Sequence, residues 1–462
     1  MLFGASARSG VAHDQGSRRR PVDRATLGAV YRAAVLGCRE WLGIRARSRA
    51  NRIVCHSRQR FELVDTVDAN QHIPEVPSMV GRPRVVIYRD FLLPSSETFI
   101  RNQAEALQRY APYYAGLTRV DGIRLPDERT VTVRQGPLAS LQSGVFTRLG
   151  LTPDFAFRIW RLRAKLIHAH FGVDGTRVMR LARTLRLPLL VTLHDYDVTT
   201  SDADLVQLAP YCRRYIRRRP RLMQQATAFL AVSEFIRSKA IERGFPAHKI
   251  LVHHIGIDTS RFTPATNAVT EPIVLFVGRL VAKKGCNDLI QAMARVQKLR
   301  PDAELVIIGD GPLRAELETQ AQSVLGRYRF LGAQPSDSVK QWYSKARIFC
   351  APSVTAPTGE TEGLPITVME AQAMALPVVS TLHAGVPEAI SDDQTGLLVQ
   401  EHDADALADR ISSLLHDPER AVRLGAAARA SVLQRFDMSR QVELLEGIYD
   451  QLVSRPSEVP RL

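Results

Sequence analysis

Short apolar runs that end in a glycine or polar turn and lead into a helical stretch recur along most of this sequence. Examples are Val85 to Tyr88, Ala228 to Val232, Ile273 to Val277 and Leu305 to Ile308. Strands that alternate with helices in this way form mostly parallel sheets with helices on both faces. The pattern predicts an α/β protein built from doubly wound, Rossmann-like sheets.

The chain is long enough for two such sheets. It has 462 residues, 45% of them hydrophobic, which is ample for two cores. The stretch 263–272 is poor in large apolar residues and rich in Ala, Thr and Pro, so we place a domain boundary there. We expect two domains facing across a cleft. Their expected bounds are 84–265 and 266–435, after a basic, poorly ordered extension at 1–83 and before a C-terminal segment at 436–462.

The cysteines indicate a reducing compartment. None of the five has a CxxC partner or a metal-ligand spacing, and no run of eighteen apolar residues occurs. The N-terminus lacks the apolar region and cleavage site of an obvious signal peptide. We therefore expect a cytoplasmic protein, with peripheral attachment to the inner face of the plasma membrane left open. The cysteines are Cys38, Cys55, Cys212, Cys286 and Cys350.

Positive charge is concentrated in the first 265 residues. Residues 84–265 contain 28 Lys and Arg against 15 Asp and Glu, whereas residues 266–462 contain 20 against 25. A basic half favours an anionic partner, which could be a membrane surface, a lipid phosphate or a nucleic acid. For the arginine-rich stretch 213–219 two interpretations stay open, namely binding to an anionic membrane and a solvated helix face.

The stretch 350–390 has the features of a phosphate-binding site. It combines a strand, a loop with Glu362-Gly363-Leu364, and a helix whose first position we assign to Pro365, where a missing N–H costs nothing. The free amides and positive dipole of a helix N-terminus bind phosphate. Glu362 and Glu370, on either side of that position, would hold hydroxyl groups of the same ligand, and this predicts a sugar nucleotide.

Two earlier turns of the second domain add cations and glycines. Gly278-Arg279 follows a buried strand, and Lys284 lies five residues beyond Arg279, so two positive charges come to the end of that strand. A diphosphate needs such neutralisation. Gly309-Asp310-Gly311 likewise forms a turn directly after the next strand, and its glycines can adopt positive φ.

Polar side chains also end the strands of the first domain. His168 and His170 share one face of a strand by the period of two, and His194 ends the following strand. An open parallel sheet presents such residues to its ligand. We expect no metal site, because no carboxylate or cysteine at short range completes the histidine pair. His194 is the better candidate for a catalytic residue. The alternative is that His194 orients the loop through a backbone hydrogen bond.

Several motifs together resemble one enzyme family. VGRLVAKKG, IIGDGP and EGLPITVMEAQAMALPVVST, in that order, look like the donor half of the retaining glycosyltransferases of family four, which have the GT-B fold. VSEFIRSKAIERGFPAHKILVHHIGIDTSRF is similar to that family's segment before the interdomain linker. LPSSETFI, HAHFG, HDYDV and PSVTAPTGETEGLP are similar to members that build exopolysaccharides and other surface glycans. The resemblance covers about residues 84–450.

This resemblance implies roles in the donor site. Arg279 and Lys284 would bind the donor diphosphate, and Glu370 would bind the ribose hydroxyls. Glu362, with the backbone of Gly363 and Leu364, would hold the transferred sugar. The family needs no metal, and no cofactor is expected beyond a UDP- or GDP-linked donor.

It also implies roles outside the donor half. His194 would contact the sugar near the reaction centre, and Ser96, Glu97 and His170 would line the acceptor side. The segment 436–452 would be a helix that returns to the first domain. Residues 94–97 read Pro-Ser-Ser-Glu where many members carry glycines, so the acceptor is the least defined part.

The expected reaction is transfer of a hexosyl unit from a nucleotide sugar to a glycan or lipid-linked acceptor. A leaving nucleoside diphosphate needs cations and amide N–H groups rather than an acid, so the two glutamates would position the ligand instead of acting as a glycosidase pair. Retention follows from the family. Alternatives are a sugar-nucleotide epimerase or hydrolase, a phosphorylase, and a non-catalytic nucleotide-sugar-binding protein. No nucleic acid or obligate protein partner is expected.

Overall fold

The computed structural model describes residues 79, 81–134, 138–208, 211–264, 270–455 and 458–460. All of them belong to one compact unit. The predicted extension at 1–83 lies almost entirely outside the described residues.

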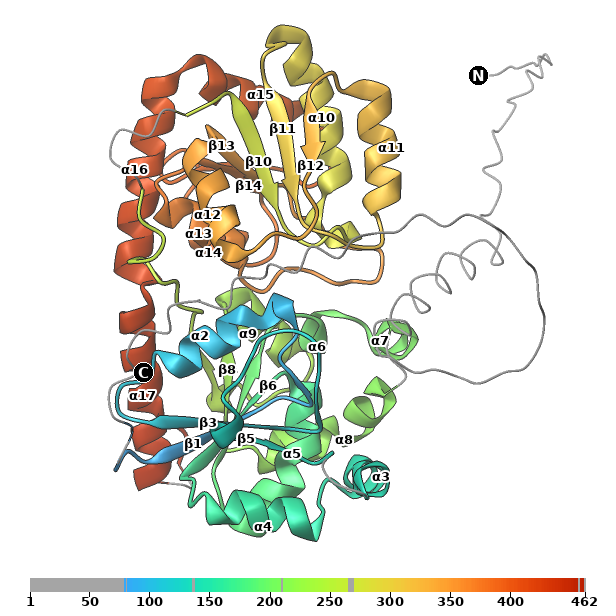
Figure 1. The fold of residues 1–462 in the computed structure, drawn as a ribbon, viewed down its shortest axis with the longest axis vertical. Helices are drawn as coiled ribbons and strands as arrows, with labels where there is room; N and C mark the ends of the chain where they lie inside the picture. The colour runs from blue at the N-terminus through green and yellow to red at the C-terminus, as the bar shows by residue number, and fades with distance from the viewer. Residues whose placement is uncertain are drawn as a thin grey trace, which may run out of the picture. The chain divides into compact units, whose positions relative to one another are not determined.

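Seven parallel strands form the first sheet, in the order β5-β3-β1-β6-β7-β8-β9 (Figure 1). A separate parallel pair joins β2 (Phe91–Leu92) to β4 (Thr118–Arg119). The strands of the first sheet are β1 (Arg84–Tyr88), β3 (Ala111–Gly116), β5 (Thr130–Thr132), β6 (Leu166–His170), β7 (Leu189–Leu193), β8 (Ala228–Ala231) and β9 (Ile250–Val252).

Six parallel strands form the second sheet, in the order β12-β11-β10-β13-β14-β15. They are β10 (Ile273–Val277), β11 (Glu304–Ile308), β12 (Tyr328–Phe330), β13 (Ile348–Ala351), β14 (Val378–Thr381) and β15 (Leu397–Val399). Both sheets thus confirm the prediction of doubly wound parallel sheets.

Helices connect the strands. Those of the N-terminal half are α2 (Thr98–Glu105), α3 (Ala139–Leu149), α4 (Pro153–Arg161), α5 (Gly172–Leu185), α6 (Tyr196–Thr199), α7 (Asp202–Leu208), α8 (Cys212–Gln225) and α9 (Glu234–Glu242). Those of the C-terminal half are α10 (Cys286–Leu299), α11 (Arg314–Val324), α12 (Ser336–Lys345), α13 (Ile366–Ala373), α14 (Val386–Ala389), α15 (Ala404–His416), α16 (Pro418–Arg435) and α17 (Met438–Ser454). Short 3-10 turns are η1 (Ser95–Glu97), η2 (Asp127–Arg129), η3 (Ala247–Lys249) and η4 (Ala282–Lys284).

Alternate residues of the central strands enter different cores. In β1, Val86 belongs to one buried cluster and Val85 to another. In β10, Leu275 belongs to the same cluster as Val86, whereas Val274 belongs to a third. Successive side chains of a strand point to opposite faces, so both sheets are buried on both faces. One of the three cores therefore contains residues of both sheets.

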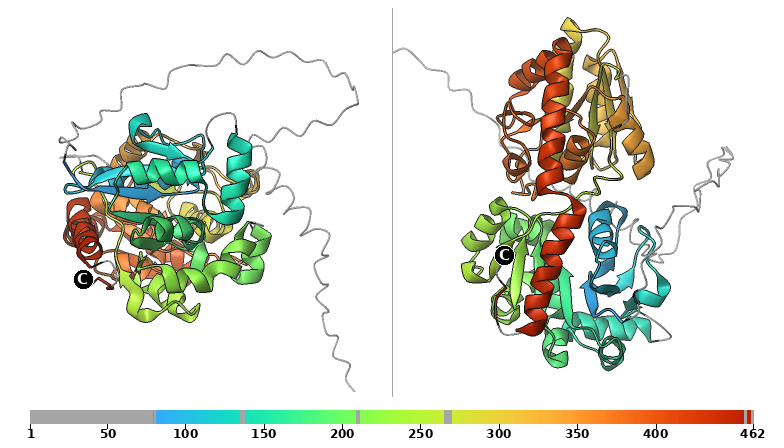
Figure 2. Two further views of the ribbon diagram at one scale, coloured as in Figure 1. Left: turned by 90° about the horizontal axis from the view of Figure 1, so that it is seen from below. Right: turned by 90° about the vertical axis from the view of Figure 1, so that its left-hand side faces the viewer.

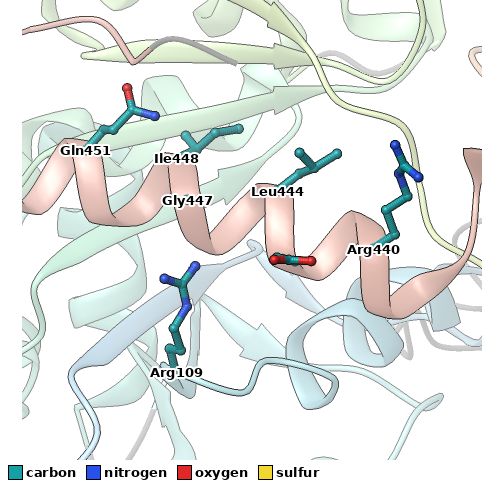
Figure 3. A pocket seen from close by; sticks show the side chains of 7 residues that line it. Arg109, Arg440, Leu444, Gly447, Ile448 and Gln451 are labelled. Carbon is teal, nitrogen blue, oxygen red and sulfur yellow. The ribbon is translucent and has the colours of Figure 1, made fainter.

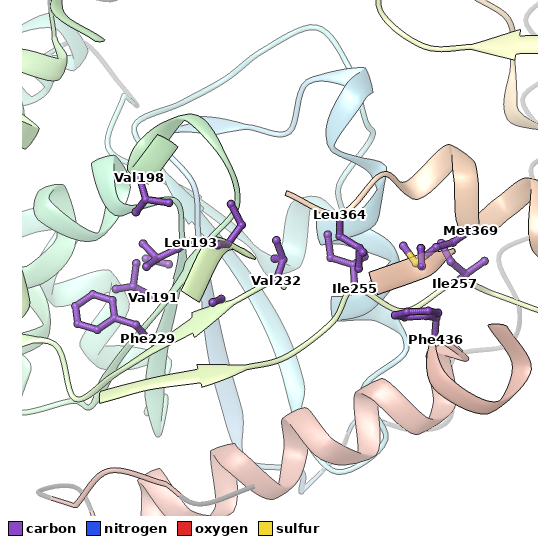
Figure 4. Close-up of a cluster of buried hydrophobic side chains, with 14 of the residues drawn as sticks. Val191, Leu193, Val198, Phe229, Val232, Ile255, Ile257, Leu364, Met369 and Phe436 are labelled. Carbon is purple, nitrogen blue, oxygen red and sulfur yellow. The ribbon is translucent and has the colours of Figure 1, made fainter. Parts of the chain in front are cut away.

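This shared core joins the two halves of the chain. Figure 4 shows Val191 and Val232 of the first half in one cluster with Leu364, Met369 and Phe436 of the second. These residues are at most 5% exposed. Burial of apolar surface is worth about 25 cal/mol per Å², so the cluster stabilises the packing of the two halves of the chain on each other.

The last helix returns to the first sheet. After α16, which packs on α13 and α15, α17 continues beside the N-terminal strands (Figure 2, right). Leu445 and Tyr449 of α17 share a core with Val85 and Ile87. The Glu446 carboxylate accepts hydrogen bonds from the amides of residues 108 and 109 at 2.8 and 2.6 Å. The helix thereby ties the end of the chain to its first strand.

The strand orders locate the ligand-binding edge of each sheet. In the first sheet the order reverses direction between β1 and β6, and in the second between β10 and β13. Open parallel sheets bind ligands at the carboxyl ends of the strands on either side of such a reversal. Arg89 and Phe171 follow β1 and β6, and Gly278 and Pro352 follow β10 and β13, so a site is expected at these four positions.

Candidate functional site

The glycine turns after β10 and β11 pack directly against each other. Gly309 has φ 140°, and a Cβ atom there would lie 1.8 Å from the carbonyl oxygen of Gly278. A Cβ atom on Gly311 would lie 2.5 Å from the carbonyl oxygen of Leu280. Only glycine allows this approach. Asp310 accepts from the Gly311 amide at 2.8 Å and so fixes the turn.

Two cations follow β10, as predicted from the sequence, but their environments differ. Arg279 is exposed and makes no hydrogen bond or ion pair with the described residues. Lys284, at the end of η4, places its Nζ 3.1 Å from Oε2 of Glu362. The structure thus brings Lys284 and Glu362 together across 78 residues of sequence.

The loop before α13 leaves its amides free. Pro365 is the N-cap, with φ −76° and ψ 107°, and the helix begins at Ile366. The expectation of Pro365 as the first helical residue was therefore wrong by one position, because its ψ is extended rather than helical. The amides of Gly363, Leu364, Ile366 and Thr367 make no hydrogen bond with described groups. Such a set of amides at a helix N-terminus binds anions.

Glu362 is buried, ionised and incompletely paired. Burial raises its pKa, but the charges of Lys284 and Lys283 outweigh this, and the pKa lies below its usual value. Its Oε1 atom and the Thr361 hydroxyl are buried without a hydrogen-bond partner in the described part of the chain. Buried polar atoms are nearly always paired, so these two oxygens mark a position where a ligand with hydroxyl groups fits.

Lys283, which the sequence reasoning missed, connects the two halves of the chain. Its side chain is buried, with Nζ 2.8 Å from Oδ2 of Asp195, 3.1 Å from the carbonyl oxygen of Thr361 and 3.9 Å from Oε1 of Glu362. The ion pairs raise the pKa of Lys283 despite its burial. Lys283 and Asp195 adjoin residues chosen from the sequence, Lys284 and His194, but nothing local in the sequence shows that they pair.

His383 is a second residue that sequence reasoning missed. It follows β14 and is almost fully buried. Its Nε2 accepts a hydrogen bond from the Glu362 amide at 3.1 Å, and its Nδ1 donates to Oε1 of Glu401 at 2.7 Å. The carboxylate fixes the imidazole tautomer, and the imidazole holds the backbone of Glu362 in place. Its position after a strand of the parallel sheet was the available signal.

Gly363 lies against the first half of the chain. A Cβ atom there would be 1.9 Å from the carbonyl oxygen of His194. The hydroxyl of Ser233, which caps α9, donates to the Gly363 carbonyl oxygen at 2.9 Å. The structure therefore places His194 next to the Glu362-Gly363-Leu364 loop.

Three histidines form a buried stack behind this loop. The rings of His168 and His170 are 4.6 Å apart, and those of His170 and His194 are 5.3 Å apart. His168 bonds to the hydroxyls of Tyr449 at 2.6 Å and Thr192 at 2.7 Å. Burial lowers the pKa of all three histidines well below the usual value, so they are neutral at pH 7.

A strained residue supports the outer end of the stack. Phe171 has φ 69°, which is uncommon for a residue with a side chain. Its ring lies 4.5 Å from the ring of His194 and carries the Arg89 guanidinium over its face at 4.4 Å. Strain of this kind is retained where the surrounding structure fixes it, often at functional sites.

The residues predicted for the acceptor side lie in different environments. Ser96 is exposed, and Glu97 is buried and bound by Arg89 through two hydrogen bonds of 2.9 and 2.7 Å. Arg89 also contacts Asp174 at 2.7 Å. Glu97 is therefore held in an ion-pair network. Of Ser96, Glu97 and His170, only His170 contacts His194 among the described residues, with its Nδ1 3.1 Å from Nε2 of His194.

Glu370 lies on α13, one helical turn beyond the free amides. Its Oε2 accepts a hydrogen bond from the hydroxyl of Tyr343 at 3.2 Å, and Oε1 has no partner among the described residues. Burial raises the pKa of Glu370 to about 7, against the lowering effects of Tyr343 and Arg261.

Among the described residues, no three His, Cys, Asp or Glu side chains come together as a metal site would need, and no helix is long and apolar enough to cross a membrane. A shallow groove of about 520 Å³ runs along α17 (Figure 3), and none of the predicted site residues lines it. Its lining residues are Arg109, Arg440, Glu443, Leu444, Gly447, Ile448 and Gln451.

Two family models match this chain, one over most of the first sheet and one over the second. The model described as Glycosyltransferase Family 4 matches residues 96–261, and the model described as Glycosyl transferases group 1 matches residues 259–431.

The curated relatives include two long matches. The amylovoran biosynthesis glycosyltransferase AmsK of Erwinia amylovora is 33% identical over 293 residues, which are 63% of this chain and 70% of that protein. The GDP-mannose-dependent alpha-(1-6)-phosphatidylinositol monomannoside mannosyltransferase of Mycobacterium tuberculosis (strain ATCC 25618 / H37Rv) is 31% identical over 356 residues, 73% of this chain and 87% of that protein.

Solved structures share the fold. Sucrose-phosphate synthase from Thermosynechococcus elongatus matches with a TM-score of 0.65 and 23% identity, over 81% of this chain and all of that chain. Anabaena Alr3699/HepE in complex with UDP and glucose matches with a TM-score of 0.62 and 18% identity, over 81% of this chain and all of that chain. Together with the two sheets, these likenesses confirm the predicted GT-B architecture.

Proposed function

Because this chain belongs to the glycosyltransferases of family four, we propose that it transfers a hexosyl unit from a nucleoside diphosphate sugar to a glycan or lipid-linked acceptor. The donor is UDP- or GDP-linked, and the anomeric configuration is retained. The product belongs to an exopolysaccharide or another surface glycan. The observation that carries the proposal is the pair of Lys284 and Glu362 beside four unbonded amides.

The proposed leaving group is the nucleoside diphosphate. Arg279, Lys284 and the amides from Gly363 to Thr367 supply positive charge where the bond between the sugar and the phosphate oxygen breaks. Preorganised donors of this type are worth about 3 kcal/mol each in transition-state stabilisation. No acid is needed, and Glu362, whose pKa lies below its usual value, is unsuited to act as one.

The proposed sugar-binding atoms have no hydrogen-bond partner among the residues that the structure describes. Oε1 of Glu362 accepts hydrogen bonds from the sugar's hydroxyl groups. The Thr361 hydroxyl can donate to them or accept from them. The neutral His194, beside Gly363, contacts the same sugar. Glu370 accepts from the ribose hydroxyls through Oε1. In the retaining reaction the acceptor oxygen bonds to the anomeric carbon while the departing phosphate oxygen takes the acceptor proton on the same face.

The relatives support the proposed classes of substrate. AmsK is named for biosynthesis of amylovoran, and the M. tuberculosis relative is named for a GDP-mannose donor and a phosphatidylinositol mannoside acceptor. HepE was solved with UDP and glucose.

Thermal unfolding of the purified full-length chain with UDP, GDP or ADP tests the nucleotide, because a ligand raises the melting temperature only if it binds the folded state. Nucleotide sugars of the stabilising base are then incubated with and without candidate acceptors. Product that forms only with an acceptor supports a transferase. Release of free sugar or an isomerised donor without acceptor supports the alternative, a hydrolase or epimerase. The proposed reaction uses no metal. A transfer rate that EDTA abolishes and Mg²⁺ restores would contradict this metal independence.

A further inference from the structure

Exposed apolar side chains gather on α3 and α4 of the first half. Leu141 is 64% exposed, Phe157 is 54% exposed and Trp160 is 62% exposed. The rings of Phe157 and Trp160 stack with centroids 5.8 Å apart. Single exposed apolar residues are common on soluble proteins, but a group that includes two adjacent aromatic rings marks an interaction surface.

The helix α8 lies beside these two helices. Arg214 and Arg218 of α8 donate hydrogen bonds to the carbonyl oxygen of Arg148 at the end of α3. The rings of Phe146 on α3 and Phe155 on α4 contact each other at 5.3 Å. Figure 1 shows α3, α4 and α8 on the same side of the first sheet. The three helices therefore pack together, with the exposed apolar side chains on α3 and α4 and the arginines on α8.

The outer face of α8 is strongly positive. Arg213, Arg217 and Arg221 recur every four residues, are exposed, and make no ion pair or hydrogen bond with the described residues. Residues 138–163 and 211–225 together contain ten arginines and one acidic residue, Asp154, a net charge of +9. Burial lowers the pKa of Arg218, and so do the neighbouring charges of Arg217 and other arginines, so this charge is not balanced locally.

We propose that this surface docks the protein on a lipid bilayer that contains anionic lipids. Trp, Phe and Leu side chains insert at the level of the headgroups, and arginines bind lipid phosphates while their apolar stems stay near the interface. The surface is defined by Leu138, Leu141, Leu149, Phe157, Trp160, Tyr211, Arg213, Arg217 and Arg221. Docking on a bilayer does not depend on the proposed reaction.

Other occupants fit this surface less well. A second copy would bring an equal positive charge against it, and the chain's own residues 1–83, with 14 Arg against seven Asp and Glu, also carry net positive charge. A nucleic acid would match the arginines, but its phosphate backbone offers nothing to the exposed leucines of α3. An anionic bilayer matches both the charge and the apolar side chains.

Co-sedimentation of the full-length protein with vesicles tests the proposal. We expect binding to phosphatidylcholine vesicles that contain about one third phosphatidylglycerol, weak binding to phosphatidylcholine alone, and a loss of binding as salt rises. The variant F157A/W160A should bind the anionic vesicles about tenfold more weakly. The variant R213E/R217E/R221E should lose binding at all salt concentrations used.

A matched control lies on α10 of the second half, where Lys298 and Leu299 are also exposed. The variant K298E/L299A should bind vesicles like the wild type. Equal melting temperatures, and equal stabilisation by the bound nucleotide, show that each variant is folded.

Three results would overturn the proposal. The first is wild-type binding of vesicles by F157A/W160A, which would place the docking elsewhere, including in residues 1–83. The second is equal weakening by K298E/L299A. The third is binding of the wild type to RNA or DNA but not to vesicles, with the arginine variant alone affected, which would make the surface a nucleic-acid site.

Discussion

The backbone of Gly363 contacts the carbonyl oxygen of His194, so closely that a Cβ atom would lie 1.9 Å from that oxygen. Gly363 belongs to the loop before α13, and His194 directly follows β7 of the other sheet. The candidate donor loop and the candidate catalytic histidine are adjacent only because position 363 carries no side chain.

Gly363→Ala should therefore push the two loops apart. The methyl group would also lie 2.9 Å from Val232, so we expect a loss of stability of about 2 kcal/mol and a fall in transfer rate of about 100-fold. Melting temperature and steady-state rates measure these effects. Gly447→Ala is the matched control, because a Cβ atom there meets nothing within 4 Å. Wild-type rates in Gly363→Ala would contradict the proposed role of this contact.

Lys284→Met should weaken donor use strongly. The substitution keeps the length of the side chain but removes the charge that lies 3.1 Å from Glu362. We expect kcat/KM for the donor to fall about 100-fold or more, since one lost charge contact to a leaving group costs about 3 kcal/mol. Lys298→Met, on the exposed face of α10, is the control. If both variants keep wild-type rates, Lys284 does not bind the diphosphate.

The ion pair between Lys283 and Asp195 should couple the two halves of the chain. Removing one partner leaves a buried charge unpaired, so Lys283→Met alone is expected to cost about 3 kcal/mol in the free energy of unfolding. In the double variant with Asp195→Asn the loss should be smaller than the sum of the single losses, by about 1 to 3 kcal/mol. Urea unfolding of the four proteins measures this coupling. Additive losses would show that the pair contributes no interaction energy.

Glu370 should make stability depend on pH. Its pKa is about 7 in the folded state and about 4.3 when unfolded, so the folded state holds the proton between these values and the unfolded chain does not. The free energy of unfolding should therefore fall as pH rises from about 4.3 to about 7. Glu370→Gln removes this contribution. Between pH 5 and pH 8 the free energy of unfolding of this variant should rise by about 2 kcal/mol relative to that of the wild type, after allowance for the partial exposure of Glu370. A pH-independent difference between the two proteins would contradict this.

The buried histidines should stay neutral near pH 6. Burial lowers the pKa of His170 and His194 well below the usual value, so protonating them opposes folding and stability falls as pH drops below about 6.5. NMR of histidine-labelled protein should show imidazole shifts of these residues that do not change between pH 8 and pH 6. A midpoint near pH 6.5 for His194 would show that its site is hydrated.

Much of the fold and part of the site could be predicted from local sequence patterns. The apolar runs predicted the parallel strands, because strands buried on both faces need continuous apolar residues. Gly278, Gly309 and Gly311 were identified from their positions after strands. The structure gives a steric reason for two of them, because a Cβ atom would lie 1.8 Å from a neighbouring carbonyl oxygen at Gly309 and 2.5 Å from one at Gly311. Lys284 and Glu362 were both chosen from the sequence, and the structure brings them together.

The sequence by itself determined the elements and their polar ends, because periodicity, glycine positions and charge are local properties. Only the tertiary structure decided that Lys283 pairs with Asp195, 88 residues away, and that His383 holds the amide of Glu362. It also decided that Glu97 is bound by Arg89, that α8 bonds to the end of α3, and that α3 packs on α4. These partners are set by how two sheets and their helices pack, and residue spacing along the chain carries no information about that packing.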